Sequence, residues 1–517
     1  MIKQRIRSAF STLLVICCLA GCGGSASPSA PSAPADGGAK TKDTLIVAMA
    51  NEPTTLDPYG KNDSTSAIYK MAIYDTLFAL GDDGVAQASI AKSWEYKDDK
   101  TLEIKLRDDV VFHDGTKMTA EDVMYSIQKT YESSYLNPFV NKIDLENTTI
   151  DDDYTITLRM VKPSGALLNC LCYVYIVPKA YHEKLGNDGF AAAPIASGPF
   201  IYKEWVHGDR VDYTANKNYW GQVASAENLV IRTVAESANR TIEIESGGVD
   251  IAMSISANDL PNLEANPDLK VVRAASWNNC FIGMNCQKEP FTDVRVRQAI
   301  SAAIDTASIV KAVYGDTGSV AKGPISPAIW GYNDDLKDHV YDPDLARDLL
   351  KQAGYEEGQL SVTISVSDTR ERQDISEMVE NMLSKIGVSC KVDVMENATY
   401  LDGIVNAAFQ MYILTWPTYT GDAEYGLYDT FYSESATWAN TCRYNNPVVD
   451  ELLDQASEVI DPTERAAFYG EIQEILVEES PWVFLWNSEE IAVCRENIDN
   501  LIAPPSGRYR LNQVTFH

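Results

Sequence analysis

The sequence predicts an α/β fold with more than one domain, and three observations indicate it. The chain has 517 residues, more than the roughly 250 to 300 at which a single core stops growing. Residues 343–395 alternate amphipathic helices that end in glycine with strand-like runs such as LSVTISVS, which is typical of parallel strands covered by helices. Paired alternating strands are expected on both sides of the KDDK turn at 97–100 and within 145–161.

The first residues predict an export signal. Lys3, Arg5 and Arg7 precede an uncharged apolar run from Phe10 to Ala20 that is too short to span a bilayer. The run ends in Leu-Ala-Gly-Cys, which matches the bacterial lipoprotein processing box. We therefore expect residues 1–21 to be removed and Cys22 to carry the lipid, fatty acids such as palmitate; a plain signal peptide is the alternative.

Residues 22–43 are rich in Gly, Ser, Ala and Pro and cannot bury apolar surface, so they predict a flexible tether. No later run is apolar enough over a sufficient length to cross a membrane. The lipid is therefore the expected anchor, on the outer side of the cell membrane, at the cell surface or in the periplasmic space.

Charge and cysteine content exclude some partners. The formal net charge is −31, so nucleic acid and anionic lipid surfaces are poor partners. Three of the ten cysteines lie in the export segment, and the spacing of the other seven fits no zinc site. Cys170 and Cys172 alternate within LLNCLCYVYIV, which predicts buried strand residues; disulfide pairs stay unassigned.

Local patterns place the first elements. A strand is expected from Thr44 and a helix over Ser66 to Leu80. Thr119, with Asp122 three residues later, predicts a capped helix start. Late in the chain, Pro462 in a first turn opens another amphipathic helix.

The stretch from Met411 to Phe431, MYILTWPTYTGDAEYGLYDTF, carries the strongest functional signal. Its first six residues are uncharged, as in a buried strand, and Pro417 ends the strand beside Trp416. The following turn gathers hydroxyl, aromatic and acidic side chains with few apolar ones, as in a binding wall at the carboxyl edge of a strand. An ordinary strand, turn and helix is the alternative.

Five segments occur along the chain in this order: FHDGTKMTAEDVMYSI, SGPFIYKEW with GDRVDYTANKNYWG, FTDVRVRQAISAAID, YDPDLARDLLKQAGY and SPWVFLWNSEEIAV. In their order and spacing they resemble the family 5 extracellular solute-binding proteins, the dipeptide, oligopeptide and nickel receptors of ABC importers. The resemblance runs from about Thr44 to the C-terminus. It implies a two-lobed fold of the periplasmic-binding-protein type (class II, cluster C) with an extra N-terminal subdomain and a hinge between the lobes.

The resemblance also implies a division of the chain. Lobe 1 would hold domain I (44–79, 197–277 and 489–517) and the extra subdomain, domain II (80–196), and lobe 2 would be domain III (278–488). The hinges would lie near 277–281 and 487–491.

Relatives place the ligand on the stretch from Trp416. Dipeptide and oligopeptide receptors have an Asp three residues after this Trp that pairs with the ligand's α-amino group; here that position is Tyr419. Asp422, Glu424 or Asp63 would have to substitute. The segment TGDAEYGLYDTF is similar to the corresponding segment in the glutathione-binding branch of the family.

Glutathione carries two carboxylates and would need cations. Arg370 and Arg372 are candidates because related receptors use an Arg hereabouts and a guanidinium binds carboxylate bidentately; solvated surface arginines are the alternative. The other expected wall residues are Thr420, Asn62, Asp63, Ser64, Asn278 and Asn279.

The sequence thus predicts a monomeric, lipid-anchored receptor that passes a small peptide or glutathione-like solute to ABC importer permease subunits. No cofactor, metal or catalytic residue is expected, because the chain has no G-x-S-x-G, H-E-x-x-H, G-x-x-x-x-G-K-[ST] or G-x-G-x-x-G motif. A nickel-chelate receptor is disfavoured because no His lies near Trp416. A peptide-pheromone signalling receptor stays open.

Overall fold

The computed structural model describes residues 43–61, 63–435 and 439–517. The described residues form one compact unit. The helices are α1 (Ser64–Ile73), α2 (Ala120–Glu132), α3 (Asn137–Val140), α4 (Leu167–Leu171), α5 (Lys179–Ala192), α6 (Ser237–Ser246), α7 (Leu260–Glu264), α8 (Val294–Ala302), α9 (Thr306–Val313), α10 (Pro343–Gln352), α11 (Arg370–Ser384), α12 (Asn397–Val405), α13 (Ala423–Phe431), α14 (Pro447–Glu458), α15 (Pro462–Glu479) and the 3₁₀ turn η1 (Leu511–Gln513).

The strands are β1 (Thr44–Met49), β2 (Phe78–Leu80), β3 (Ala86–Ala88), β4 (Ala91–Asp98), β5 (Thr101–Leu106), β6 (Thr149–Asp152), β7 (Thr155–Arg159), β8 (Phe200–Val206), β9 (Arg210–Ala215), β10 (Asn228–Thr233), β11 (Ile251–Met253), β12 (Leu269–Met284), β13 (Gly318–Val320), β14 (Ser361–Ser367), β15 (Ser389–Met395), β16 (Met411–Pro417), β17 (Trp482–Arg495), β18 (Ile498–Asp499) and β19 (Thr515–Phe516).

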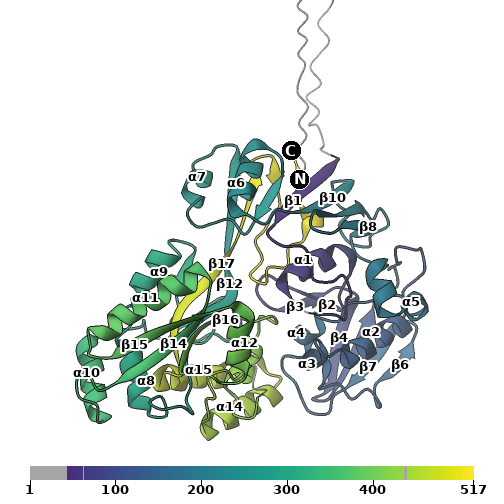
Figure 1. The fold of residues 1–517 in the computed structure, drawn as a ribbon. Coiled ribbons are helices and arrows are strands. Elements are labelled where there is room, and N and C mark those ends of the chain that lie inside the picture. The colour runs from purple at the N-terminus through teal and green to yellow at the C-terminus, as the bar shows by residue number, and fades with distance from the viewer. Residues whose placement is uncertain (1–42, 62, 436–438) are drawn as a thin grey trace, which may run out of the picture. The chain divides into compact units, whose positions relative to one another are not determined.

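The long strands β12 and β17 connect the two lobes. They run antiparallel beside each other through an 11-stranded sheet, in which ten strands follow the order β15-β14-β16-β12-β17-β11-β1-β10-β9-β8 and β13 pairs with β17 (Figure 1). One end of this ribbon pairs with β16 and the other with β11. Their register shifts between Ala275 and Asn279, where Ser276 Oγ and Ser488 Oγ are 2.5 Å apart. The fold is therefore α/β and two-lobed.

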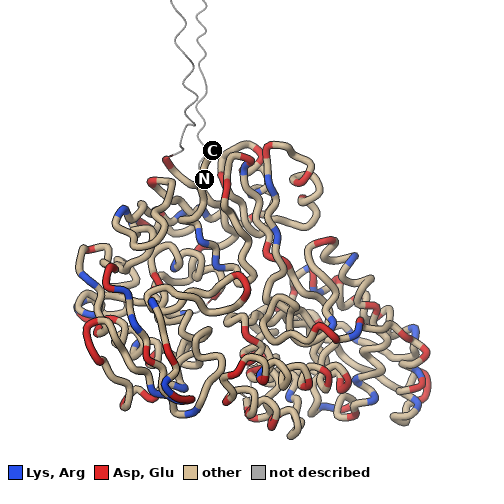
Figure 2. The backbone as a smooth tube through the Cα atoms, turned by 180° about the vertical axis from the view of Figure 1, so that it is seen from behind, with Lys and Arg blue, Asp and Glu red and all other residues tan. Residues whose placement is uncertain are grey.

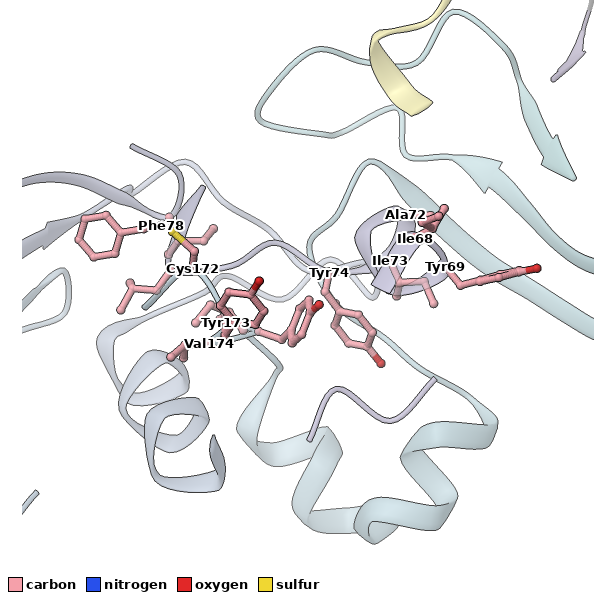
Figure 3. Packing of buried hydrophobic residues seen from close by; sticks show 14 of the residues in the cluster. Ile68, Tyr69, Ala72, Ile73, Tyr74, Phe78, Cys172, Tyr173 and Val174 are labelled. Carbon is pink, nitrogen blue, oxygen red and sulfur yellow. The ribbon is translucent and has the colours of Figure 1, made fainter. Parts of the chain in front are cut away.

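Lobe 1 is built on the β1 half of the sheet. β1 pairs in parallel with β10 and β11, and β9 and β8 continue antiparallel. Its core contains α1 and the segment 172–177, and Figure 3 shows Tyr69, Tyr74 and Tyr173 in this core. Burying several tyrosine rings stabilises the lobe where their hydroxyls find partners, and Tyr74 donates to the Leu56 carbonyl at 2.9 Å.

A separate four-stranded antiparallel sheet, β4-β5-β7-β6, lies beside α2 in the region expected to form the extra subdomain. The predicted KDDK turn joins β4 to β5. The predicted cap of α2 is confirmed, since Thr119 and Asp122 form a capping box.

In lobe 2, β15, β14 and β16 are parallel, as the alternation of helices and strands predicted. α10 and α11 are followed by Gly354 and Gly387, both in the left-handed region. α15 begins at Pro462, as expected. Acidic residues recur along the whole described backbone (Figure 2), consistent with the net charge of −31.

Two local predictions are wrong. The helix expected over Ser66 to Leu80 ends at Ile73, because the Ile73 carbonyl accepts a hydrogen bond from Gly198 instead of continuing the helix. Cys170 lies in helix α4 and Cys172 in the turn after it, not in a strand, because LLNCL forms a helical turn that packs on α3. Apolar alternation over a few residues does not distinguish these conformations.

The seven cysteines among the described residues form no disulfide. None of the helices in the described ranges is both long and apolar enough to cross a membrane. Cys22 and the tether expected at 22–43 lie outside the described residues, apart from Asp43.

Candidate functional site

The stretch from Trp416 forms the end of β16 and a tight turn into α13. Thr418 N–H donates to the Trp277 carbonyl at 3.1 Å, which fixes the turn against β12. Gly421 has φ +66°, and a Cβ there would lie 2.6 Å from the Trp277 ring, so only glycine fits. Asp422 then caps α13 by accepting from Glu424 N–H at 2.9 Å.

The Asp422 carboxylate is already neutralised within lobe 2. Arg465 donates to its two oxygens at 2.8 and 3.1 Å, and both side chains are about 5% exposed or less. Burial raises the pKa of Asp422, although Arg465 opposes the shift. A buried carboxylate in a two-bond pair of this kind holds the turn in place.

The turn also contacts the extra subdomain. Tyr173 Oη donates to the Tyr419 carbonyl, and Asn169 Nδ2 donates to the Thr420 carbonyl at 2.8 Å. Lys142 forms an ion pair with Glu424, whose other oxygen lies 3.5 Å from Arg465. Lobe 2 and the region expected to form the extra subdomain therefore meet at the predicted binding wall.

Four rings form a column across this boundary, which we call the aromatic column: Trp416, Tyr425, Phe139 and Tyr173. Ring centroids are 6.3 Å apart for Trp416 and Tyr425, 5.9 Å for Tyr425 and Phe139, and 4.3 Å for Phe139 and Tyr173. All three pairs are stacked. Tyr419 lies beside the column, edge-on to Tyr425 and Tyr173. Stacked ring pairs of this kind stabilise the contact between the elements that carry them.

Arg508 lies at the Tyr173 end of the column. Its guanidinium carbon is 3.9 Å from the Tyr173 ring centroid, and it donates to the Cys172 carbonyl at 3.2 Å and to Tyr175 Oη at 3.4 Å. The residue is 8% exposed, and within the described part of the chain no carboxylate forms an ion pair with it. A buried cation without a counter-ion is unusual.

Of the expected first-lobe residues, Asp63 lies close enough to Tyr419 for its charge to act on it. Asp63 caps α1 by accepting from Ser66 N–H at 2.8 Å, and Ser64 is exposed at the helix start. Burial raises the pKa of Tyr419, and the nearby Asp63 charge adds to the shift. Asn62 lies outside the described residues.

The remaining expected residues lie on other elements. Asn279 is buried on β12 and donates to the Gly323 carbonyl and to Asn487, both at 3.0 Å; Asn278 is its partly buried neighbour. Arg370 is exposed and pairs with Asp374 at 2.7 Å. Arg372 lies over Tyr400, 5.1 Å from its centroid. Neither arginine contacts the aromatic column.

Sequence reasoning missed Phe139, Tyr173 and Arg508 as parts of the site, and it missed that Tyr425 belongs to the aromatic column. They come from parts of the chain more than 30 residues apart, so no local spacing links them. In the described ranges no group of three or more His, Cys, Asp and Glu side chains is arranged to hold a metal ion.

Two lobes joined by two crossing strands, with a polar and aromatic wall where they meet, are the architecture of a two-lobed solute-binding protein. The profile of the bacterial extracellular solute-binding proteins, family 5 (middle region), matches residues 86–438. The chain belongs to this family.

Known relatives differ in what they bind. The chain is 28% identical over 477 residues to the glutathione-binding protein GsiB of Shigella dysenteriae, covering 90% of this chain and 93% of that protein. It is 27% identical over 539 residues to heme-binding protein A of Haemophilus influenzae, covering 98% and 97%. Its fold is similar to the DppA periplasmic binding protein of Helicobacter pylori in complex with the peptide STSA, with a TM-score of 0.78, 26% identity and coverage of 92% and 98%.

Proposed function

We propose that this protein captures a small peptide or glutathione-like solute between its lobes and presents it to the permease subunits of an ABC importer. The observation that carries the proposal is the aromatic column with the uncompensated Arg508 at one end. Rings would hold the uncharged body of such a solute, and a buried guanidinium would bind one of its carboxylates.

The relatives support this class of ligand. GsiB is named for glutathione, and the DppA structure holds a peptide. Tyr419 replaces the acidic residue that the resemblance leads us to expect, and Asp422 is occupied by Arg465. The ligand's amine would therefore need another acidic partner.

The proposed contact residues are those that lie at the meeting of the lobes. We propose Trp416, Tyr419, Thr420 and Glu424 from lobe 2 with Arg508 from lobe 1, and Asn62, Asp63 and Ser64 as the opposite edge. Asp422 supports this wall from behind. Asn278, Asn279, Arg370 and Arg372 are proposed only for a ligand long enough to reach β12 and α11.

We also propose that closure occurs about the register shift between β12 and β17, which lies at the expected hinges. We propose the same domain division as before: domain I comprises 44–79, 197–277 and 489–517, domain II comprises 80–196, and domain III comprises 278–488. Export, a lipid on Cys22, a position outside the cytoplasm and a monomeric state complete the proposal.

Calorimetric titration of the purified protein tests the proposed ligand class. Glutathione, Ala-Ala and a nickel–histidine complex would each be added. We expect saturable binding of glutathione or the dipeptide and none of the nickel complex. Saturation by the nickel complex alone would overturn the proposal. If none of the three compounds binds, the proposed ligand class is also contradicted.

A further inference from the structure

A cavity of about 240 Å³ lies between the extra subdomain and lobe 2. Phe139, Lys142 and Cys170 line one side, and Glu424, Tyr425 and Asp429 line the other. A cavity of this size is smaller than the roughly 300 to 1,000 Å³ of a pocket that holds a whole drug-sized ligand. It would therefore hold one group of a ligand rather than all of it.

Each charged side chain around the cavity has an ion-pair or hydrogen-bond partner, with one exception. Glu424 pairs with Lys142 and Arg465, and Lys162 pairs with Glu458 at 2.8 Å. Asp454 accepts from Tyr428 Oη at 2.9 Å and from Tyr432 Oη at 3.3 Å.

Asp429 is the exception. In the described part of the chain its carboxylate has neither a hydrogen-bond nor an ion-pair partner, although it is partly buried on α13. Burial raises its pKa to about 7; the Glu424 charge adds to the shift and Lys142 opposes it. An ionised carboxylate in this position lacks a counter-ion.

The other lining groups supply no counter-ion for Asp429. Phe139 and Tyr425 are stacked members of the aromatic column, and Tyr428 adds a third uncharged ring. Both lysines that line the cavity, Lys142 and Lys162, already pair with other carboxylates, so neither is available to Asp429.

We propose that this cavity is a subsite for a primary ammonium group of the ligand, with the Asp429 carboxylate as its counter-ion. The inference rests on the proposed function and deepens it, because it supplies the acidic partner that Tyr419 does not. The ammonium belongs either to the ligand's amino terminus or to a lysine-like side chain. The cavity adjoins the two middle rings of the column, Tyr425 and Phe139, and Arg508 lies on Tyr173. Together they would select dipolar ligands.

Matched peptides and variants test the subsite. Calorimetry would compare Ala-Nle with N-acetyl-Ala-Nle, which lacks the terminal amine, and Ala-Lys with Ala-Nle, which lacks the side-chain amine. In the unmodified protein we expect one ammonium peptide to bind about tenfold or more tightly than its neutral partner. The pair that shows the difference identifies the source of the ammonium.

Asp429→Asn should reduce that preference to about onefold, because the amide carries no charge. Glu451→Gln, an exposed acid on α14 that does not line the cavity, is the matched control and should keep it. An unchanged preference in Asp429→Asn would overturn the subsite.

If none of these peptides binds, the proposed function fails and the subsite is tested separately. Thermal unfolding would then be followed in n-butylammonium chloride and in sodium chloride at equal concentration. We expect n-butylammonium to raise the unfolding temperature of the unmodified protein more than that of Asp429→Asn. Equal shifts in both proteins would overturn the subsite.

Discussion

Asp422 and Arg465 form a buried pair with hydrogen bonds of 2.8 and 3.1 Å, which fixes the turn that carries the proposed binding wall. Arg465 also lies 4.6 Å from the Trp330 ring centroid and donates to Tyr469 Oη at 3.1 Å. The acid with the most obvious position in the sequence is thus part of the support of the site. This relationship leads to the first prediction.

Asp422→Asn should destabilise the protein by about 3 kcal/mol or more, because it removes the carboxylate that accepts two hydrogen bonds from the buried Arg465 guanidinium and leaves only Glu424, 3.5 Å away. Urea denaturation followed by circular dichroism measures the change. Asp374→Asn removes an exposed helical pair with Arg370 and should cost about 0.5 kcal/mol or less. Equal losses in both variants would show that the Asp422 pair has no special structural role.

Trp416→Ala and Tyr419→Ala should each weaken ligand binding by about tenfold while the protein stays folded, because both rings border the aromatic column. Calorimetry with the ligand found for the unmodified protein gives the affinities, and circular dichroism checks the fold. Tyr135→Ala, which removes an exposed ring, is the control. Unchanged affinity in both variants would remove this stretch from the site.

Arg508→Gln should selectively weaken ligands that carry a free carboxylate, because it removes the buried guanidinium at the end of the column. The comparison is glutathione against its glycine monoethyl ester. We expect the variant to lose about tenfold for the acid and little for the ester. Arg510→Gln, two residues later, is the control and should keep its affinity for both the acid and the ester. An equal loss of affinity for acid and ester in Arg508→Gln would mean that Arg508 only supports the fold.

Asp429 should make stability fall as pH rises. Its pKa is about 7 in the folded protein and has an ordinary value of 3.8, so between about pH 4 and pH 7 the folded state binds a proton that the unfolded state has lost. Folding stability is therefore greatest below this window and decreases through it. The environment includes Glu424, Lys142, Lys162, Asp454, Tyr425, Tyr428 and Cys170.

Asp429→Asn should reduce the slope of the unfolding free energy against pH by the amount that corresponds to one bound proton, as measured by urea denaturation at a series of pH values. Glu490 is buried, and its pKa is raised to about 7 by the same cause, so Glu490→Gln should reduce the slope similarly and provides a comparison. A slope unaffected by Asp429→Asn would mean that its carboxylate is not buried in solution.

Much of the fold follows from local signals in the sequence. Pro417 marks the end of β16, the Thr119 capping box marks the start of α2, and glycines mark the ends of α10 and α11. Such signals act over a few residues and need no knowledge of the partner elements. They failed at Ile73, where a distant Gly198 amide ends the helix.

The candidate site was only partly predictable for the same reason. Trp416 and Tyr419 lie within one local pattern. Arg508, by contrast, donates to the Cys172 carbonyl, 336 residues away, and Lys142 donates to Glu424, 282 residues away. Such contacts depend on how the lobes pack. Arg370 and Arg372 had a suitable chemistry, but α11 directs them to Asp374 and Tyr400.

The most direct test of the central claim is native mass spectrometry of the purified protein, followed by denaturing release and identification of any small molecule that accompanied it. We expect a peptide or a thiol tripeptide with both an ammonium and a carboxylate group, which would match Asp429 in the cavity and Arg508 beside Tyr173. A metal chelate or a solute without these charges would contradict the account.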